Sequence, residues 1–124
     1  MSDQTPRETL MMLDDRDGHR SAWTGNDVDT LVPQHRVGGM GGSPSKHLAS
    51  NVVWLESDIN GFIEADVEWQ REAFRRGIKV SRFQDPAVVP IEHAVHGRVL
   101  LDDEGGWMPA DTADPFAEWR TDRG

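Results

Sequence analysis

Residues 31–62 decide the fold, and they read LVPQHRVGGMGGSPSKHLASNVVWLESDINGF. Two histidines, two asparagines and five glycines fall within these thirty-two residues. A packed core does not need so many small and polar side chains, because buried polar groups must find hydrogen-bond partners. Imidazole and amide groups do move protons and bind cations. The composition of this stretch therefore indicates a site rather than a core.

The patterns around the glycines predict a strand, a loop, a strand and a helix in that order. Residues 19–33 read as two short strands joined by a Gly-Asn turn, ending at Pro33. Residues 36–46 contain four glycines and predict a loop, and residues 51–56 predict a compact strand. Residues 57–77 predict one helix closed by Gly77. Its apolar stripe consists of Ile63, Val67, Gln70 and Phe74.

The segments outside this unit predict a helix before it and strands after it. The N-terminal helix begins at Thr5 and Pro6 and ends at Gly18, which suits a left-handed cap. Residues 88–110 predict two or three strands with a hairpin turn at residues 103–106. His93 and His96 fall on one strand, where a spacing of three turns them to opposite faces, so they are expected to be poor joint ligands.

Composition limits the class of protein. A chain of 124 residues is sufficient for one modest core, and the absence of cysteine excludes disulfides and thiolate zinc sites. No apolar run is long enough to span a bilayer and no signal layout is present, which predicts a cytoplasmic protein without membrane contact. The net charge of −9 disfavours a nucleic-acid partner overall, although five basic residues gather between Arg71 and Arg82.

Four side chains lie at the ends of the predicted strands or in the first turn of the predicted helix, and their chemical groups suggest a functional site. His35 ends the first strand and suits a general base acting on water. Asn51 precedes the second strand and is placed to tie down the loop, whereas Asn60, in the first helical turn, and Gln34 offer oxygen ligands to a hard cation. Three of the four also have an ordinary structural explanation: His35 as a loop histidine, Asn51 as a turn residue and Asn60 as a helix-start residue.

This order and spacing resembles the HNH, or ββα-metal, nuclease family, in which a His follows the first strand, an Asn precedes the second and a His or Asn lies in the helix. The resemblance covers residues 6–83 and is greatest to HNH proteins of actinobacterial phages. It implies a catalytic role for His35 and Asn51, and metal ligation by Asn60 and Gln34. It also implies substrate binding by Arg36, Lys46 and His47, and Mg²⁺ or Mn²⁺ as the cofactor.

The chain departs from the family at identifiable positions. Cysteine-bearing members hold a structural zinc, and the corresponding positions here are Ser21, Thr24, Glu56 and Ile59, so no structural zinc is expected. Packing around Trp23, Trp54, Leu55 and Phe62 is expected to replace it. Gln34 stands where the family has Asp, Glu or His, and Asn60 replaces the commoner His, which weakens the expected cation site.

The resemblance implies an α+β fold, with an HNH ββα core at residues 1–85 and a β-hairpin extension and tail at residues 86–124. The implied function is a phage endonuclease that hydrolyses DNA phosphodiesters with one divalent ion in the infected bacterial cytoplasm. The alternative is a catalytically degenerate HNH fold that binds a host or phage protein, since a fold does not fix a function.

Overall fold

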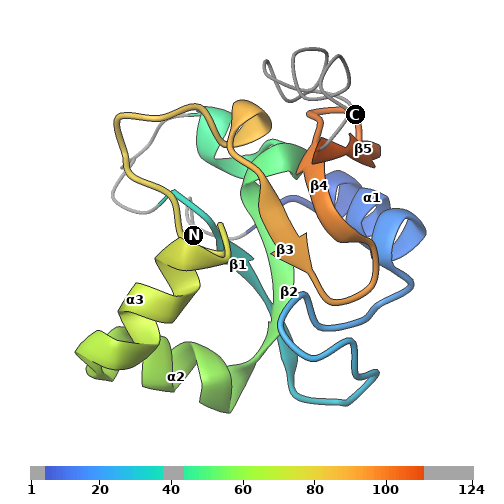
Figure 1. Ribbon diagram of the computed structural model, residues 1–124. Coiled ribbons are helices and arrows are strands. Elements are labelled where there is room, and N and C mark those ends of the chain that lie inside the picture. The colour runs from blue at the N-terminus through green and yellow to red at the C-terminus, as the bar shows by residue number, and fades with distance from the viewer. Residues whose placement is uncertain (1–4, 38–43, 111–124) are drawn as a thin grey trace, which may run out of the picture.

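A computed structural model describes residues 5–37 and 44–110 of the chain. Its helices and antiparallel strands confirm the predicted α+β class (Figure 1). The α-helices of the described part are α1 (Arg7–Asp17), α2 (Ser57–Ala65) and α3 (Val67–Arg75). Its strands are β1 (Leu31–His35), β2 (Val52–Glu56), β3 (Ile91–His93), β4 (Gly97–Leu101) and β5 (Trp107–Pro109). Short 3-10 turns are η1 (Pro44–His47), η2 (Ala49–Asn51) and η3 (Pro86–Val88).

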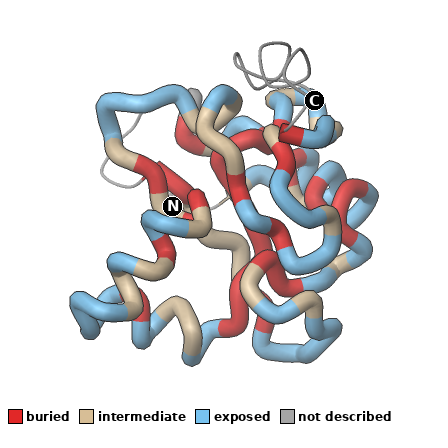
Figure 2. Tube along the Cα trace, in the orientation of Figure 1, coloured by how far each residue is buried: buried red, intermediate tan, exposed pale blue. Residues whose placement is uncertain are grey.

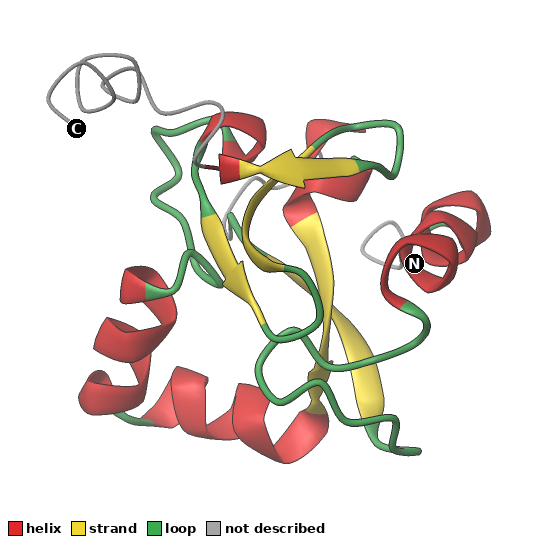
Figure 3. Cartoon of the chain, turned by 45° about the vertical axis from the view of Figure 1, so that its right-hand side comes forward, coloured by secondary structure: helices red, strands yellow, loops and turns green. Residues whose placement is uncertain are grey.

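The strands form two antiparallel sheets. β1 pairs with β2 so that Leu31 lies opposite Glu56 and His35 lies opposite Val52. The second sheet has the order β3–β4–β5. In Figures 1 and 3, α1 lies on one side of the β1–β2 hairpin, and α2 and α3 lie on the other.

Each face of the β1–β2 hairpin packs against its own helices, because neighbouring side chains on a strand point to opposite faces. Val52 and Trp54 join Leu31 in a buried cluster with Leu13 of α1. Val53 and Leu55 point the other way, into the main core, which also contains Ile63 of α2 and Ala73 of α3. The β1–β2 hairpin therefore separates two apolar clusters, one on each of its faces.

The main core includes residues from both predicted segments, 1–85 and 86–124. Ile91, Val99 and Leu101 are at most 1% exposed and pack with Val53 and Leu55. The buried positions follow the strands, whereas α2 and α3 are largely exposed (Figure 2). The β3–β4–β5 sheet thus shares the core of the preceding unit.

Several local predictions are confirmed. Gly18 ends α1 with φ 69° and ψ 31°, the left-handed conformation that favours glycine. β2 occupies the predicted strand, and three strands follow with a turn between β4 and β5. These segments carry strong local signals in the form of a left-handed cap, an apolar run and a turn rich in Asp and Gly.

Other local predictions are wrong. Residues 57–77 form two helices because Asp66 is extended and its carboxylate accepts the backbone N–H groups of Glu68 and Trp69, which caps α3. Two residues of the expected apolar stripe, Val67 and Phe74, are more than half exposed and not buried. Phe62, which was expected to pack in the core, is 47% exposed. Residues 19–30 form turns instead of the expected first strand. The N-terminal helix begins at Arg7 without the predicted side-chain cap.

The predicted glycine loop falls largely on residues 38–43, which lie outside the described part, as does the tail from residue 111. Among the helices of the described residues, none combines the length and the apolar character that crossing a membrane requires.

Candidate functional site

The loop between β1 and β2 is tied down by Asn51, as expected from the sequence. Its side-chain oxygen accepts the backbone N–H of Val37 at 2.8 Å, and its side-chain nitrogen donates to the carbonyl of Lys46 at 2.9 Å. Asn51 itself is 0% exposed. Because Val37 and Lys46 lie on opposite sides of the undescribed residues 38–43, Asn51 fixes where that loop leaves and rejoins the fold.

His35 lies beside a second imidazole at the loop end of β1. The distance from His35 Nε2 to His47 Nδ1 is 3.3 Å, and the ring centroids are 5.2 Å apart. η1 carries His47, and the hydroxyl of Thr9 in α1 donates to the His47 carbonyl at 2.9 Å. The half-buried pair is thus held by contacts from α1 and from the tied loop.

The prediction that Arg36 binds substrate is wrong, because its guanidinium serves the fold. Arg36 is 0% exposed, and its nitrogens donate to the carbonyls of Gly77, Ser50, Pro86 and Val89 at 2.8–2.9 Å. It fastens β1 to the segments that follow α3. These carbonyls use four of the five N–H donors of the guanidinium, and burial keeps a phosphate from reaching the fifth.

Strand alternation turns Gln34 and His35 to opposite faces of the hairpin. Gln34 lies opposite Val53, whose side chain is in the core beneath α2. His35 lies opposite Val52, whose side chain packs toward α1. The expected oxygen ligand is therefore on the α2 side of the sheet, and the expected base is on the α1 side.

Asn60 lies on α2 with a side-chain oxygen that is buried and has no hydrogen-bond partner within the described part of the chain. Glu64 follows one helical turn later, and both border the buried Ile63. An unpaired buried oxygen costs free energy unless something outside the described residues satisfies it. Asn60 therefore has a buried acceptor that a ligand could satisfy, as does Glu56, whose Oε1 is also without a partner in the described residues.

Lys79 connects this helix face to β1. Its ammonium donates to the backbone carbonyl of His35 at 3.5 Å and interacts with Glu64. Burial lowers the pKa of Lys79, and the Glu64 carboxylate works against that change. Both line a pocket of about 260 Å³, whose other walls are Ile63, Gln70 and Phe74. Sequence reasoning missed both residues, although the spacing of four from Asn60 is a signal that points to Glu64.

The four positions that the resemblance aligns with zinc-binding cysteines lie in the turn after α1, at the end of β2 and in the first turn of α2. Residues 21–24 form a tight turn in which the Ser21 hydroxyl accepts the N–H groups of Trp23 and Thr24. The Thr24 hydroxyl donates to Glu56 at 2.6 Å, and Ile59 packs against the main core. A hydrogen bond and apolar packing now join these positions.

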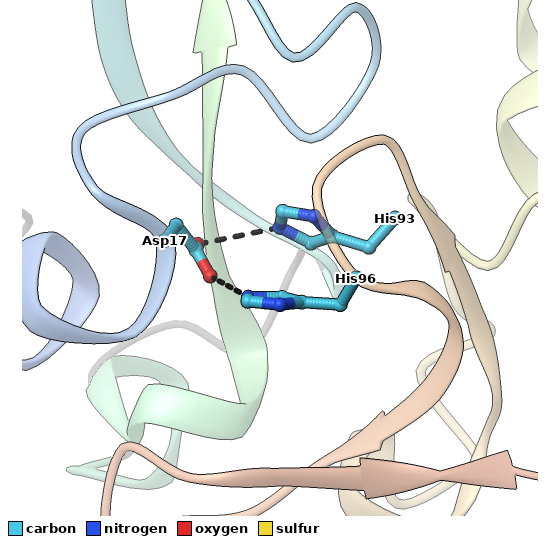
Figure 4. Close-up of side chains that lie close together, drawn as sticks. All are labelled: Asp17, His93 and His96. Carbon is cyan, nitrogen blue, oxygen red and sulfur yellow. Dashed lines mark hydrogen bonds and ion pairs between the residues drawn. The ribbon is translucent and has the colours of Figure 1, made fainter.

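A second histidine cluster was not expected from the sequence (Figure 4). Asp17, at the end of α1, lies 3.3 Å from His93 Nε2 and 3.0 Å from His96 Nε2. The prediction that His93 and His96 face apart is wrong, because β3 ends at His93 and the chain turns through residues 94–96. Asp17 and His96 are 79 positions apart, so no local pattern announces their contact.

The arrangement of this cluster suits a hydrogen-bonded network better than a metal centre. The ligand atoms of Asp17, His93 and His96 lie within 4.8 Å of one another. However, Arg16 donates to both Asp17 oxygens at 2.8 Å, so the carboxylate charge is already balanced. His93 Nδ1 accepts the N–H of Val95 at 3.1 Å, which places the proton of a neutral ring on Nε2, the atom a metal would need.

No protein-family model matches the chain, and comparisons with curated proteins and with solved structures return no match either. The geometry of the chain itself is therefore the basis for assigning a function.

Proposed function

We propose that the protein is a metal-dependent endonuclease of the HNH type that hydrolyses DNA phosphodiesters. The observation that carries this proposal is the unit β1–loop–β2–α2, in which Asn51 ties the loop and His35 ends the first strand. Two further features support it. Asn60 offers an unpaired buried oxygen from α2, and Thr24 and Glu56, at two of the positions that the resemblance aligns with cysteines, are joined by a hydrogen bond.

The α2 side of the hairpin carries oxygen donors of the kind that a hard divalent cation binds. Gln34 on β1 and Asn60 on α2 carry amide oxygens, and Glu64 adds a carboxylate that the resemblance to the HNH family does not include. Mg²⁺ and Mn²⁺ bind such oxygens, with water and phosphate completing their coordination. When bound, a cation of this kind stabilises charge on the phosphate and on the leaving 3′ oxygen.

His35 is the base in the proposed reaction. Because His35 faces α1 whereas Gln34 and Asn60 are on the α2 side, the reaction requires a phosphate that reaches both faces of the hairpin at the loop end of β1. His35 takes a proton from water as the water oxygen forms a bond to phosphorus and the bond from phosphorus to the 3′ oxygen breaks. His47, at 3.3 Å, is the neighbour that shares a hydrogen bond with the imidazole and restrains its ring. The Lys79 ammonium holds the adjoining backbone of β1 by donating to the carbonyl of His35.

Plasmid cleavage tests the proposal. Purified protein with Mg²⁺ or Mn²⁺ should nick or cut plasmid DNA, and His35→Ala should lower the rate by roughly 10² to 10⁴, the usual contribution of a positioned general base. Asn60→Ala should lose activity and partly recover with excess metal. Mn²⁺ is expected to support a higher rate than Mg²⁺, because it is less demanding of its ligands.

His19→Ala is the control, since this half-exposed histidine pairs with Asp14 and packs on Trp54, neither of which has a role in the proposed reaction, so cleavage should be unchanged. Thermal melting of each variant separates loss of activity from loss of fold. Absence of cleavage by the wild type across both metals and both single- and double-stranded substrates would refute the endonuclease.

A protein-binding role is the second candidate, favoured by apolar side chains left exposed on α2 and α3. Phe62 is 47% exposed, Val67 59% and Phe74 54%. A net charge of −9 also suits a protein partner better than DNA. In this case His35→Ala changes neither the fold nor the biological effect, and charged substitutions at these apolar positions abolish binding.

A further inference from the structure

At the end of α1, Arg16 and Asp17 connect this helix to η2, to β2, to β3 and to the β3–β4 turn. Arg16, beside Asp17, also donates to the carbonyls of Ala49 in η2 and Val52 in β2, at 2.8 and 3.0 Å. His93 and His96 approach the carboxylate from β3 and from the β3–β4 turn. The His96 ring stacks on Trp107 of β5, with centroids 4.5 Å apart. Asp17 thus connects α1 to the sheet of the C-terminal strands.

The hydrogen bonds of His93 require its neutral form. The Val95 N–H points at Nδ1, so that nitrogen must keep its lone pair. The side chain of His93 is 0% exposed, which opposes a charged ring. A proton on Nδ1 would set two N–H groups against each other and break the bond that closes the turn.

The charged groups around His93 already include Arg16, and they do not favour a positively charged His93 ring as well. α1 contributes Arg16 and Asp17, which neutralise each other at 2.8 Å, and the β3–β4 turn contributes His96. β2 and η2 face the cluster with the backbone carbonyls that accept from Arg16, and β5 faces it with the uncharged Trp107 ring. Burial lowers the pKa of His93, an effect that Asp17 opposes.

We propose that Asp17, His93 and His96, with Arg16, fasten the β3–β4 turn to α1, and that this turn is a proton-operated clamp, which the Val95–His93 bond closes while His93 is neutral and which opens when His93 takes up a proton. Opening frees residues 94–96 from the bond that closes the turn. The proposal is independent of the nuclease activity, because it concerns the attachment of the second sheet.

Amide hydrogen exchange measured by NMR on the full chain tests the clamp. After correction for the intrinsic effect of pH, exchange of the Val95 amide should accelerate below neutral pH by up to about tenfold per pH unit, the limit for release coupled to one proton. The Val53 amide, which belongs to the β1–β2 hairpin, should keep its protection over the same range. At pH 7, nitrogen shifts of the His93 ring should report a proton on Nε2 and none on Nδ1.

The His93→Asn variant distinguishes the effect of protonating residue 93 from the effect of its packing. Its side-chain oxygen can accept the Val95 N–H but cannot take up a proton, so the pH dependence of exchange should disappear. His19→Asn is the control, because His19 pairs with Asp14 at the same helix end at 2.9 Å but is 43% exposed. This substitution should leave the pH dependence of the wild type intact.

The wild-type ring measurement decides the matter even where His93→Asn does not fold. A proton on Nδ1 at pH 7, or a Val95 amide whose exchange is insensitive to pH, overturns the clamp. Added Zn²⁺ should leave the His93 and His96 signals in place. A Zn²⁺-induced shift that His96→Gln abolishes would identify a metal centre instead and also overturn the proposal.

Discussion

Two histidine pairs lie in this protein with different surroundings. His35 and His47 are half-buried at the rim of the loop between β1 and β2, with rings 5.2 Å apart. His93 and His96 have rings 4.8 Å apart, but their side chains are 0% and 9% exposed, and Asp17 and Arg16 lie against them. An imidazole that can meet water and substrate can act as a base. An imidazole that is buried against a carboxylate holds elements together.

The largest expected effect comes from removing the carboxylate of the buried cluster. Asp17→Ala leaves the buried Arg16 without its carboxylate counter-charge and should lower the free energy of unfolding by about 3–5 kcal/mol. Urea denaturation measures this, with Asp14→Ala as the control. Asp14 is 51% exposed in its pair with His19, so its loss should cost less than about 1 kcal/mol. Equal effects at both positions would remove the distinction between buried and exposed pairs.

Asn51 and Asn60 provide a sharper test, because the resemblance assigns both to the site but the structure gives them different bonds. Asn51→Ala leaves the Val37 N–H and the Lys46 carbonyl without this partner and should cost about 2–4 kcal/mol, at roughly 1–2 kcal/mol for each buried group. Asn60→Ala removes an oxygen that has no partner in the described residues, so stability should hardly change. A large loss of stability for Asn60→Ala, measured by urea denaturation, would contradict its assignment as a ligand awaiting a cation.

Stability should fall as the pH drops below about 6.5, the usual pKa of histidine. Burial lowers the pKa of His93 in the folded state, so the unfolded chain binds more protons in this range and acid favours unfolding. The slope is at most about 1.4 kcal/mol per pH unit for one proton. Burial alone raises the pKa of Asp17, but His93 and Arg16 outweigh it and hold the pKa below its usual range. The Asp17 contribution is therefore lost only at still lower pH, below about 3.8.

Urea denaturation at pH 7, 6 and 5 measures this slope for the wild type and for His93→Asn. The variant should give a flatter profile between pH 7 and 5, since its residue 93 does not titrate. Parallel profiles would assign the acid sensitivity to the remaining histidines.

The smallest expected effect is that of a chelator. No set of zinc ligands is formed by Ser21, Thr24, Glu56 and Ile59. Two of these residues, Thr24 and Glu56, are joined by a hydrogen bond instead. Melting temperatures with and without a strong chelator should coincide. A clear drop would reveal a structural metal elsewhere and would reopen the assignment of the Asp17 cluster.

The sequence by itself determined the elements that local chemistry controls. Alternation and apolar runs located β2 and the C-terminal strands, Gly18 marked the end of α1, and Asn51 was placed to tie the loop. In these cases the signal lies within a few residues, because a cap, a turn or a strand depends on its neighbours in the chain.

The tertiary structure alone decided which polar side chains became structural. Arg36, expected at the substrate, is buried among four carbonyls from distant segments, and Asp17 meets His96 from 79 positions away. Asp66 divided the expected long helix in two. The strand register also sent Gln34 and His35 to opposite faces. Such outcomes depend on which segments pack together, and the periodicity of a single segment carries no information about its partners.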